Sequence, residues 1–242
     1  MIFRLLLLLE LLHLVSTSFC AKEVELRYKP RSRESIYTFY SRAETMLKNG
    51  PMERLTQTSS NLYLSQMTMQ VLTNGNLLQR VGVSAGNLSI GDRVIAHPAL
   101  GQFLEFVQTP LGGIPKIVGN GNQFSVKNLQ FELPKGPVSI GTTWSVTVPP
   151  TPTFPVATET RYQVVNFLGD LVVLRAKTDL DRAEFVPGMY FSFKGTSQII
   201  FHIVEGLLLR SEGNHYMEVS MERRGNEQIT RMNLNSILEL QF

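Results

Sequence analysis

Residues 198–242 read QIIFHIVEGLLLRSEGNHYMEVSMERRGNEQITRMNLNSILELQF and carry the clearest pattern in the chain. Apolar residues recur at every second position through much of this stretch, with polar residues between them. A period of two places the two sets on opposite faces of a β-strand. Turn-forming pairs interrupt the pattern at Glu205-Gly206, Gly213-Asn214 and Gly225-Asn226, and Gly or Asn tolerates the positive φ of tight hairpins. The stretch therefore predicts four antiparallel strands in a meander, with one apolar and one polar face.

The same reading extends toward the N-terminus. Alternation begins at residues 24–28, and turn pairs such as Asn74-Gly75 and Gly169-Asp170 stand between apolar runs. Long helical periodicity is absent after the first 20 residues. We therefore predict a mainly β protein of antiparallel, twisted sheets with a hairpin meander, built as a sandwich or half-barrel with an N-terminal signal helix.

The domain organisation follows from two breaks in composition. Residues 1–20 form the first segment and are predicted to be a signal peptide. Residues 149–155, PPTPTFP, contain four prolines and predict a stiff, extended connector. This connector is either a linker between two similar lobes or a crossing from one sheet to another. It separates an N-terminal β lobe, 21–148, from a C-terminal β-meander lobe, 156–242.

The N-terminus predicts export. Arg4 precedes an apolar run over residues 5–15, and small residues follow up to Cys20, which is typical of a secretory signal peptide. Glu10 lies inside the apolar run, so a buried N-terminal helix is the alternative. Cys20 is the only cysteine: signal peptidase cuts after it, or it is the lipidated first residue of a lipoprotein. The expected location is periplasmic or extracellular, with membrane contact only through a lipid anchor or an uncleaved N-terminal segment.

Composition narrows the classes of function. The chain is 43% hydrophobic and 18% charged, with a formal net charge of +3, so it can bury a core but offers few charges. Basic residues are scattered and form no stripe with interleaved aromatics, which argues against nucleic-acid binding. Its four histidines, His13, His97, His202 and His215, lack the local spacing of metal ligands. We expect neither a metal nor a cofactor.

Two segments resemble a known family. Residues 136–144, GPVSIGTTW, and residues 201–213, FHIVEGLLLRSEG, look like parts of an uncharacterised family of exported, β-rich bacterial proteins. Its members carry a signal peptide or lipoprotein signal, a Gly-x-Val-Ser-Ile-Gly-x-x-Trp start to a central strand, and a late hairpin around Gly-Leu-Leu. The resemblance implies an envelope protein without catalytic residues. The layout also resembles exported half-barrels that carry acyl chains between membranes, an analogy of fold alone.

One pattern suggests catalysis. Residues 82–86, GVSAG, match the nucleophile elbow that exposes a serine, here Ser84, at a strand-to-helix turn. Asp181 followed by His202 or His215 would supply the rest of a triad in the right chain order. No helix is predicted after Ser84, so a glycine-flanked β-turn is the favoured interpretation, and we expect no enzyme.

The apolar faces suggest binding instead. Methionine is flexible and polarizable, so methionine-rich strands can line a pocket for an acyl chain, although they also fill ordinary cores. The sequence thus predicts a non-enzymatic envelope protein that binds a lipid or another hydrophobic partner in a β-sheet groove. The alternative is a structural or protein-interaction module without a small ligand. The candidate pocket residues are Met67, Met69, Met217, Val219, Met221, Met232 and Leu234.

Overall fold

The computed structural model describes residues 23–118, 131–150, 155–223 and 226–241. Its strands all belong to one 12-stranded antiparallel sheet with the order β6-β5-β3-β2-β1-β12-β11-β10-β9-β8-β7, and β4 pairs with β3. The strands are β1 (Ser35–Asn49), β2 (Met52–Val71), β3 (Leu77–Ile90), β4 (Arg93–Ala96), β5 (Phe103–Gln108), β6 (Lys116–Ile117), β7 (Thr143–Val148), β8 (Thr158–Leu168), β9 (Leu171–Val186), β10 (Met189–His202), β11 (Leu207–Arg223) and β12 (Asn226–Gln241).

The prediction of an antiparallel, mainly β fold is confirmed. Consecutive long strands are joined by tight turns, including those that the sequence indicated at Gly75 and Gly169, both of which have positive φ. In the part of the chain that the structure describes, no helix is long and apolar enough to span a membrane. The predicted signal helix and Cys20 lie outside the described residues.

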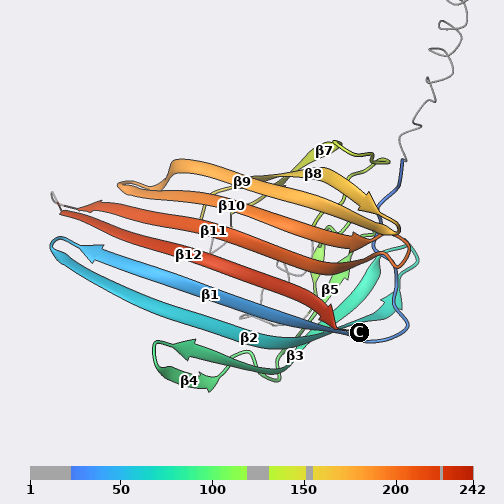
Figure 1. Cartoon of the computed structure of the whole chain (residues 1–242), viewed down its shortest axis with the longest axis horizontal. Helices are drawn as coiled ribbons and strands as arrows, with labels where there is room; N and C mark the ends of the chain where they lie inside the picture. The colour runs from blue at the N-terminus through green and yellow to red at the C-terminus, as the bar shows by residue number, and fades with distance from the viewer. Residues whose placement is uncertain (1–22, 119–130, 151–154, 224–225, 242) are drawn as a thin grey trace, which may run out of the picture.

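Strands from both predicted lobes lie in the same sheet. β1 pairs with β12 over its length, from Ile36 opposite Gln241 to Asn49 opposite Gln228. β7 and β8, on either side of the proline-rich segment, are also paired neighbours. The chain thus joins its N-terminal and C-terminal strands in the middle of the sheet, as Figure 1 shows for β1 and β12.

One predicted turn is wrong. Residues 198–242 contain the end of β10 and two strands, β11 and β12, rather than four strands. Gly213-Asn214 lies inside β11, paired with Ser197 and Thr196 of β10. The glycine allows neighbouring side chains to approach the backbone closely and does not form a turn. A Cβ at Gly213 would lie 2.6 Å from both His215 Nε2 and Ser197 Oγ.

The sheet curls around its own core at one end. Directly paired residues of antiparallel strands point to the same face, so the registers divide the sheet into two faces. The inner face is the one in register with Phe39, Leu62 and Leu238. Inner-face residues from distant strands, such as Phe106 of β5 and Tyr162 of β8, join one buried cluster. The inner face is therefore concave.

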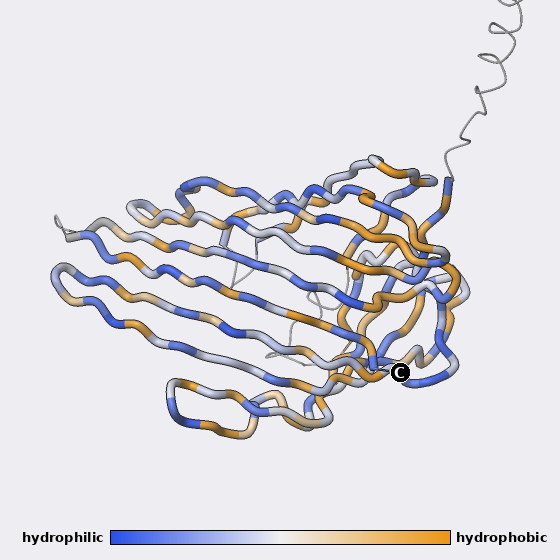
Figure 2. Tube along the Cα trace, viewed as in Figure 1, coloured by the Kyte–Doolittle hydropathy of each residue, from blue (hydrophilic) through white to orange (hydrophobic). Residues whose placement is uncertain are grey.

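Aromatic side chains fill this closed end, where Figure 2 shows the hydrophobic segments gathered. Phe201 is fully buried and meets the Tyr28 ring edge-on at a centroid distance of 5.3 Å. Phe131 contacts both rings and stacks on Tyr162 at 5.8 Å. The segments around Tyr28 and Phe131 thus pack under the sheet, and a backbone bridge between Val24 and Val138 ties them together.

Two tyrosine hydroxyls are buried with these rings. The Tyr37 hydroxyl donates to the Leu208 carbonyl oxygen at 3.0 Å. Burial raises the pKa of Tyr37 to about 12, and burial raises the pKa of Tyr28 above its usual range. Both phenols therefore stay protonated at physiological pH and act as neutral hydrogen-bonding groups.

Replacing Phe201 with alanine tests the position of the core. We expect Phe201→Ala to lower the free energy of unfolding by about 3–5 kcal/mol, because it removes a fully buried ring and leaves a cavity. The matched control is Phe103→Ala on the outer face, where the ring is 60% exposed and lies under Arg80; its cost should stay within about 1 kcal/mol. Urea unfolding measures both, and equal costs would contradict this core.

Candidate functional site

The two faces of the sheet differ in charge. On the inner face, the described strand side chains include no carboxylate and only two cations, Arg54 and Arg93. The outer face carries the ion pairs of the long strands. Arg210 donates to Glu239 at 2.7 Å and Glu212 at 3.1 Å. The inner face is thus an almost uncharged surface on a protein whose outer face is charged.

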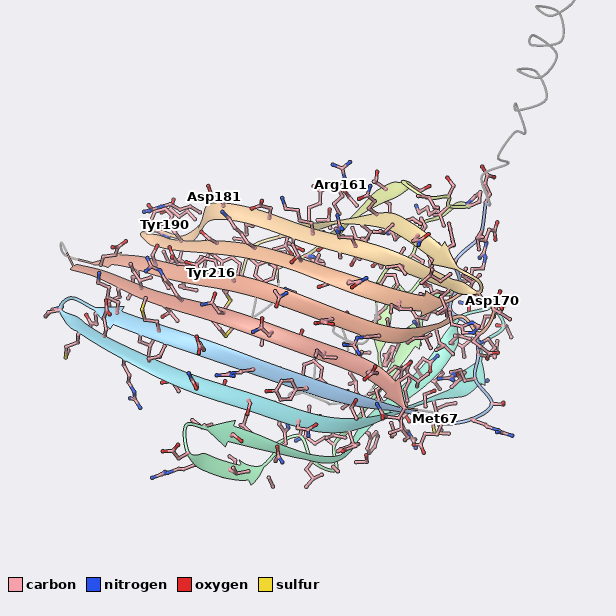
Figure 3. The ribbon with its side chains drawn as sticks, in the orientation of Figure 1. Met67, Arg161, Asp170, Asp181, Tyr190 and Tyr216 are labelled. Carbon is pink, nitrogen blue, oxygen red and sulfur yellow. The ribbon has the colours of Figure 1, made fainter. Side chains whose placement is uncertain are left out.

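A hydrogen-bonded cluster shows how the outer face holds its charges. The Tyr216 hydroxyl and Arg231 Nε both donate to Glu218 Oε2, at 2.6 and 2.7 Å. These two hydrogen bonds, that from Tyr216 first, hold the pKa of Glu218 below its usual range. In Figure 3, Tyr190 lies near the hairpin tip at the start of β10, and Tyr216 lies about midway along β11.

Beyond the core, the inner face carries apolar side chains toward the hairpin tips; they are half-buried except for Phe191, which is 1% exposed. Met217 of β11 is paired with Met232 of β12 and with Phe193 of β10. None of these strip residues belongs to the buried core cluster or packs against it. We call this surface the apolar strip; its members are Met189, Phe193, Met217, Val219, Met221, Met232 and Leu234.

Five of the seven predicted pocket residues lie in this strip: Met217, Val219, Met221, Met232 and Leu234. The other two lie elsewhere. Met67 of β2 is paired with Arg80 on the outer face and is 37% exposed. It lies at the closed end of the sheet, far from Tyr216 in Figure 3. Met69 occupies a β-bulge of β2 opposite β3 and is also exposed.

A histidine lies beside the apolar strip in a cradle of glycines. The His215 imidazole stacks on Phe193 with a centroid distance of 5.8 Å. A Cβ at Gly195 would lie 2.7 Å from His215 Nδ1, and one at Gly213 would lie 2.6 Å from His215 Nε2. Both positions must therefore be glycine for the ring to lie flat on the sheet. Sequence reasoning missed this cradle because the two glycines are on different strands.

His215 is held in its neutral form. Its Nδ1 is buried and has no hydrogen-bond partner in the described residues. The inner-face neighbours across the strands are Gly195 and Leu234, and those along β11 are Gly213 and Met217; none is ionisable. Burial lowers the pKa of His215, because a charged imidazole would lack both water and a counter-ion.

The residues of the hydrolase hypothesis do not come together. Ser84 lies within β3, at a bulge, and its hydroxyl donates to the Tyr63 carbonyl oxygen at 3.2 Å. β3 continues to Ile90 where an elbow would need a helix. Three strands, β2, β1 and β12, separate β3 from His215 on β11. Within the described residues, no group of His, Cys, Asp and Glu has a metal-binding arrangement.

Two small cavities lie away from the strip. One of about 20 Å³, room for one water, is at the closed end beside Gln108, whose fully buried amide has no partner among the described residues. The other, about 210 Å³, is polar and lies beside Tyr40, Arg42 and Gln57 of the outer face. Neither includes a predicted pocket residue.

Comparison with solved structures gives a likeness of fold. The chain is similar to part of lipovitellin, in a structure described as lipid–protein interactions in lipovitellin: the TM-score is 0.52 with 11% sequence identity, over 89% of this chain and 25% of that one. This chain thus spans a quarter of the lipovitellin chain. DynF from the dynemicin biosynthesis pathway of Micromonospora chersina is 8% identical over 90% of this chain and 85% of its own, but its TM-score of 0.23 carries no argument. No protein-family model and no curated protein matches the sequence.

The glycine cradle can be tested by a double-mutant cycle. Gly195→Ala should cost about 1–3 kcal/mol of unfolding free energy, because its Cβ pushes the imidazole off the sheet. In a His215→Ala background the same change should cost much less, since the imidazole that it displaces is gone. Chemical denaturation of the four proteins gives the coupling energy. A coupling near zero would show that the ring does not lie over Gly195.

The neutral state of His215 predicts a pH dependence. With a folded-state pKa below the ordinary value of about 6.5, the unfolded chain binds the proton first as pH falls. The stability that comes from the neutral imidazole of His215 is therefore fully present above about pH 6.5 and declines below it. His215→Phe should remove this part of the decline; His97, whose pKa burial also lowers, still contributes. Urea unfolding from pH 8 to pH 5 measures the difference, and identical pH profiles would refute it.

Proposed function

We propose that this chain is a non-enzymatic, exported protein that binds a lipid or another hydrophobic molecule on the apolar strip of its inner face. The observation that carries the proposal is the separation of charge: the strip is half-buried, apolar and uncharged, whereas charges gather on the outer face. A ligand that covers half-exposed apolar side chains removes them from water, which lowers the free energy by about 25 cal/mol per Å² of apolar surface.

The geometry of the strip suits an extended apolar chain. From the row of Leu234 to the row of Met221 it extends six residues along the strands, which is roughly 20 Å at about 3.3 Å per residue. Methionine and phenylalanine side chains dominate it, and the methionines can adjust to ligands of different shape. A flexible hydrocarbon lying along the strands would contact Met217, Met221 and Met232 together.

The likeness to lipovitellin supports the proposal at the level of fold. The lipovitellin structure is described as one of lipid–protein interactions, and this chain matches a quarter of the lipovitellin chain. Export is proposed from the N-terminal sequence, and a place in a bacterial envelope rests on the sequence resemblance alone. The geometry gives no comparable support to a protein-interaction module or to hydrolysis at Ser84.

A charge placed on the strip should weaken binding. Met232→Glu introduces a carboxylate between Met217 and Thr45 on the inner face, and a bound hydrocarbon would have to bury that charge. We expect at least a roughly tenfold weaker affinity for N-phenyl-1-naphthylamine, an apolar dye that fluoresces when bound. Fluorescence titration measures the dissociation constant.

The matched control is Asn233→Glu, the next residue of β12, which is exposed on the outer face. It adds the same charge to the same strand and should leave dye binding unchanged. Thermal melts show whether both variants remain folded. Absence of dye binding by the wild-type protein, or equal binding by the two folded variants, would refute the proposed site.

A further inference from the structure

A row of small polar residues crosses the inner face between the core and the apolar strip. Successive strands place Ser60 opposite Ser41, Ser41 opposite Ser236, and Ser236 opposite Gly213. Gly213 is in turn opposite Ser197 of β10. We call these positions the serine belt; it consists of Ser60 of β2, Ser41 of β1, Ser236 of β12, Gly213 of β11 and Ser197 of β10.

Larger apolar residues border the core side of the belt on four of its five strands. They are Leu62, Phe39, Leu238 and Ile199, at the next inner-face position of β2, β1, β12 and β10; on β11 that position is Ser211. On the other side lie Leu234 and His215, with the small residues Ala43 and Gly195 on the strands beside them. The belt is thus bordered by bulky apolar side chains chiefly on its core side.

One hydroxyl of the belt is buried without a partner among the described residues. Ser60 is 8% exposed, and its Oγ is buried without a hydrogen bond in the described part of the chain. A buried hydroxyl without a partner costs about 1–3 kcal/mol, so a group that bonds with it is favoured there. His215 Nδ1, which lies over Gly195 in the row beside the belt, is likewise buried and unpartnered among the described residues.

Charge decides which polar group fits. The two inner-face cations are away from the belt: Arg54 lies toward the hairpin tip of β2, and Arg93 is in the short strand β4. The inner-face neighbours of the belt are neutral. A carboxylate or phosphate group would lose its water there without gaining a counter-ion, whereas an uncharged hydroxyl would exchange hydrogen bonds with water for hydrogen bonds with serine.

We propose that the serine belt binds the uncharged hydroxyl headgroup of a lipid whose hydrocarbon chain lies on the apolar strip. The inference rests on the proposed function and adds the class of ligand and its orientation. Ser60 and Ser41 donate to or accept from the ligand hydroxyl, and the chain extends along β11 and β12 toward Met221. An alcohol, monoacylglycerol or sterol has the required chemistry, and a fatty-acid anion does not.

Three C18 compounds test the headgroup at constant chain length: oleyl alcohol, 1-octadecene and oleate. Each displaces bound N-phenyl-1-naphthylamine at pH 8, and the displacement midpoint gives its affinity. For the wild-type protein, oleyl alcohol should bind roughly tenfold more tightly than oleate, because only oleate must bury a charge. Oleate binding as tightly as the alcohol would overturn the assignment to uncharged lipids.

The double variant Ser41→Ala/Ser60→Ala tests the belt itself. It should lower the affinity for oleyl alcohol about tenfold, the effect of one or two lost hydrogen bonds, and leave the affinity for 1-octadecene unchanged. The matched control, Ser59→Ala/Ser65→Ala, removes two hydroxyls from the outer face of β2 and should change neither affinity. If the double variant does not fold, Ser236→Ala gives the same comparison with about a threefold loss.

The outcomes separate the two proposals. An unchanged affinity for oleyl alcohol in the folded belt variant overturns the belt as the headgroup site, while binding of 1-octadecene still supports the apolar strip. Failure of the dye, the alcohol and the alkene to bind the wild-type protein refutes the proposed function and the headgroup site with it.

Discussion

The uninterrupted register of the central strands is the constraint on which the rest of this structure depends. β2, β1, β12 and β11 pair without a single bulge, so residues far apart in sequence line up in rows across the sheet. A slip of one residue would turn every side chain of a strand to the other face. It would turn Glu218 and Arg231 onto the inner face and expose Leu238, and the free-energy cost would exceed the stability of an ordinary protein. Core, apolar strip and serine belt are three rows or groups of rows fixed by one register.

The sequence predicts those parts of the fold that depend on one strand at a time. Alternation along β11 and β12 identifies Met217, Val219, Met221, Met232 and Leu234 as neighbours on a shared face, and the glycines at hairpin turns mark where strands end. Gly213 shows the limit of this reasoning. A Gly-Asn pair favours a turn locally, but Gly213 lies in the middle of β11, where the imidazole of His215 on the same strand occupies the space that a Cβ would fill.

The serine belt could not be predicted because it exists only across strands. Ser41, Ser60, Ser197 and Ser236 each look like ordinary polar positions, and nothing local indicates that they share a row. Met67 illustrates the converse. It continues a methionine pattern with Met69, but alternation along β2 places it on the face opposite the buried Leu62 and Leu64, which is the outer face. Whether a methionine of one strand shares a face with Met217 depends on how the strands pair, which only the sheet topology supplies.

Pairing of β1 with β12 also governs the order in which the protein can be assembled during synthesis. β1 is the first of the described strands to leave the ribosome and β12 is the last, so one edge of the β1–β2 hairpin stays open until nearly the whole chain has been made. Open edges beside apolar residues invite pairing with other chains. The edge of β1 therefore stays without its final partner until β12 is available.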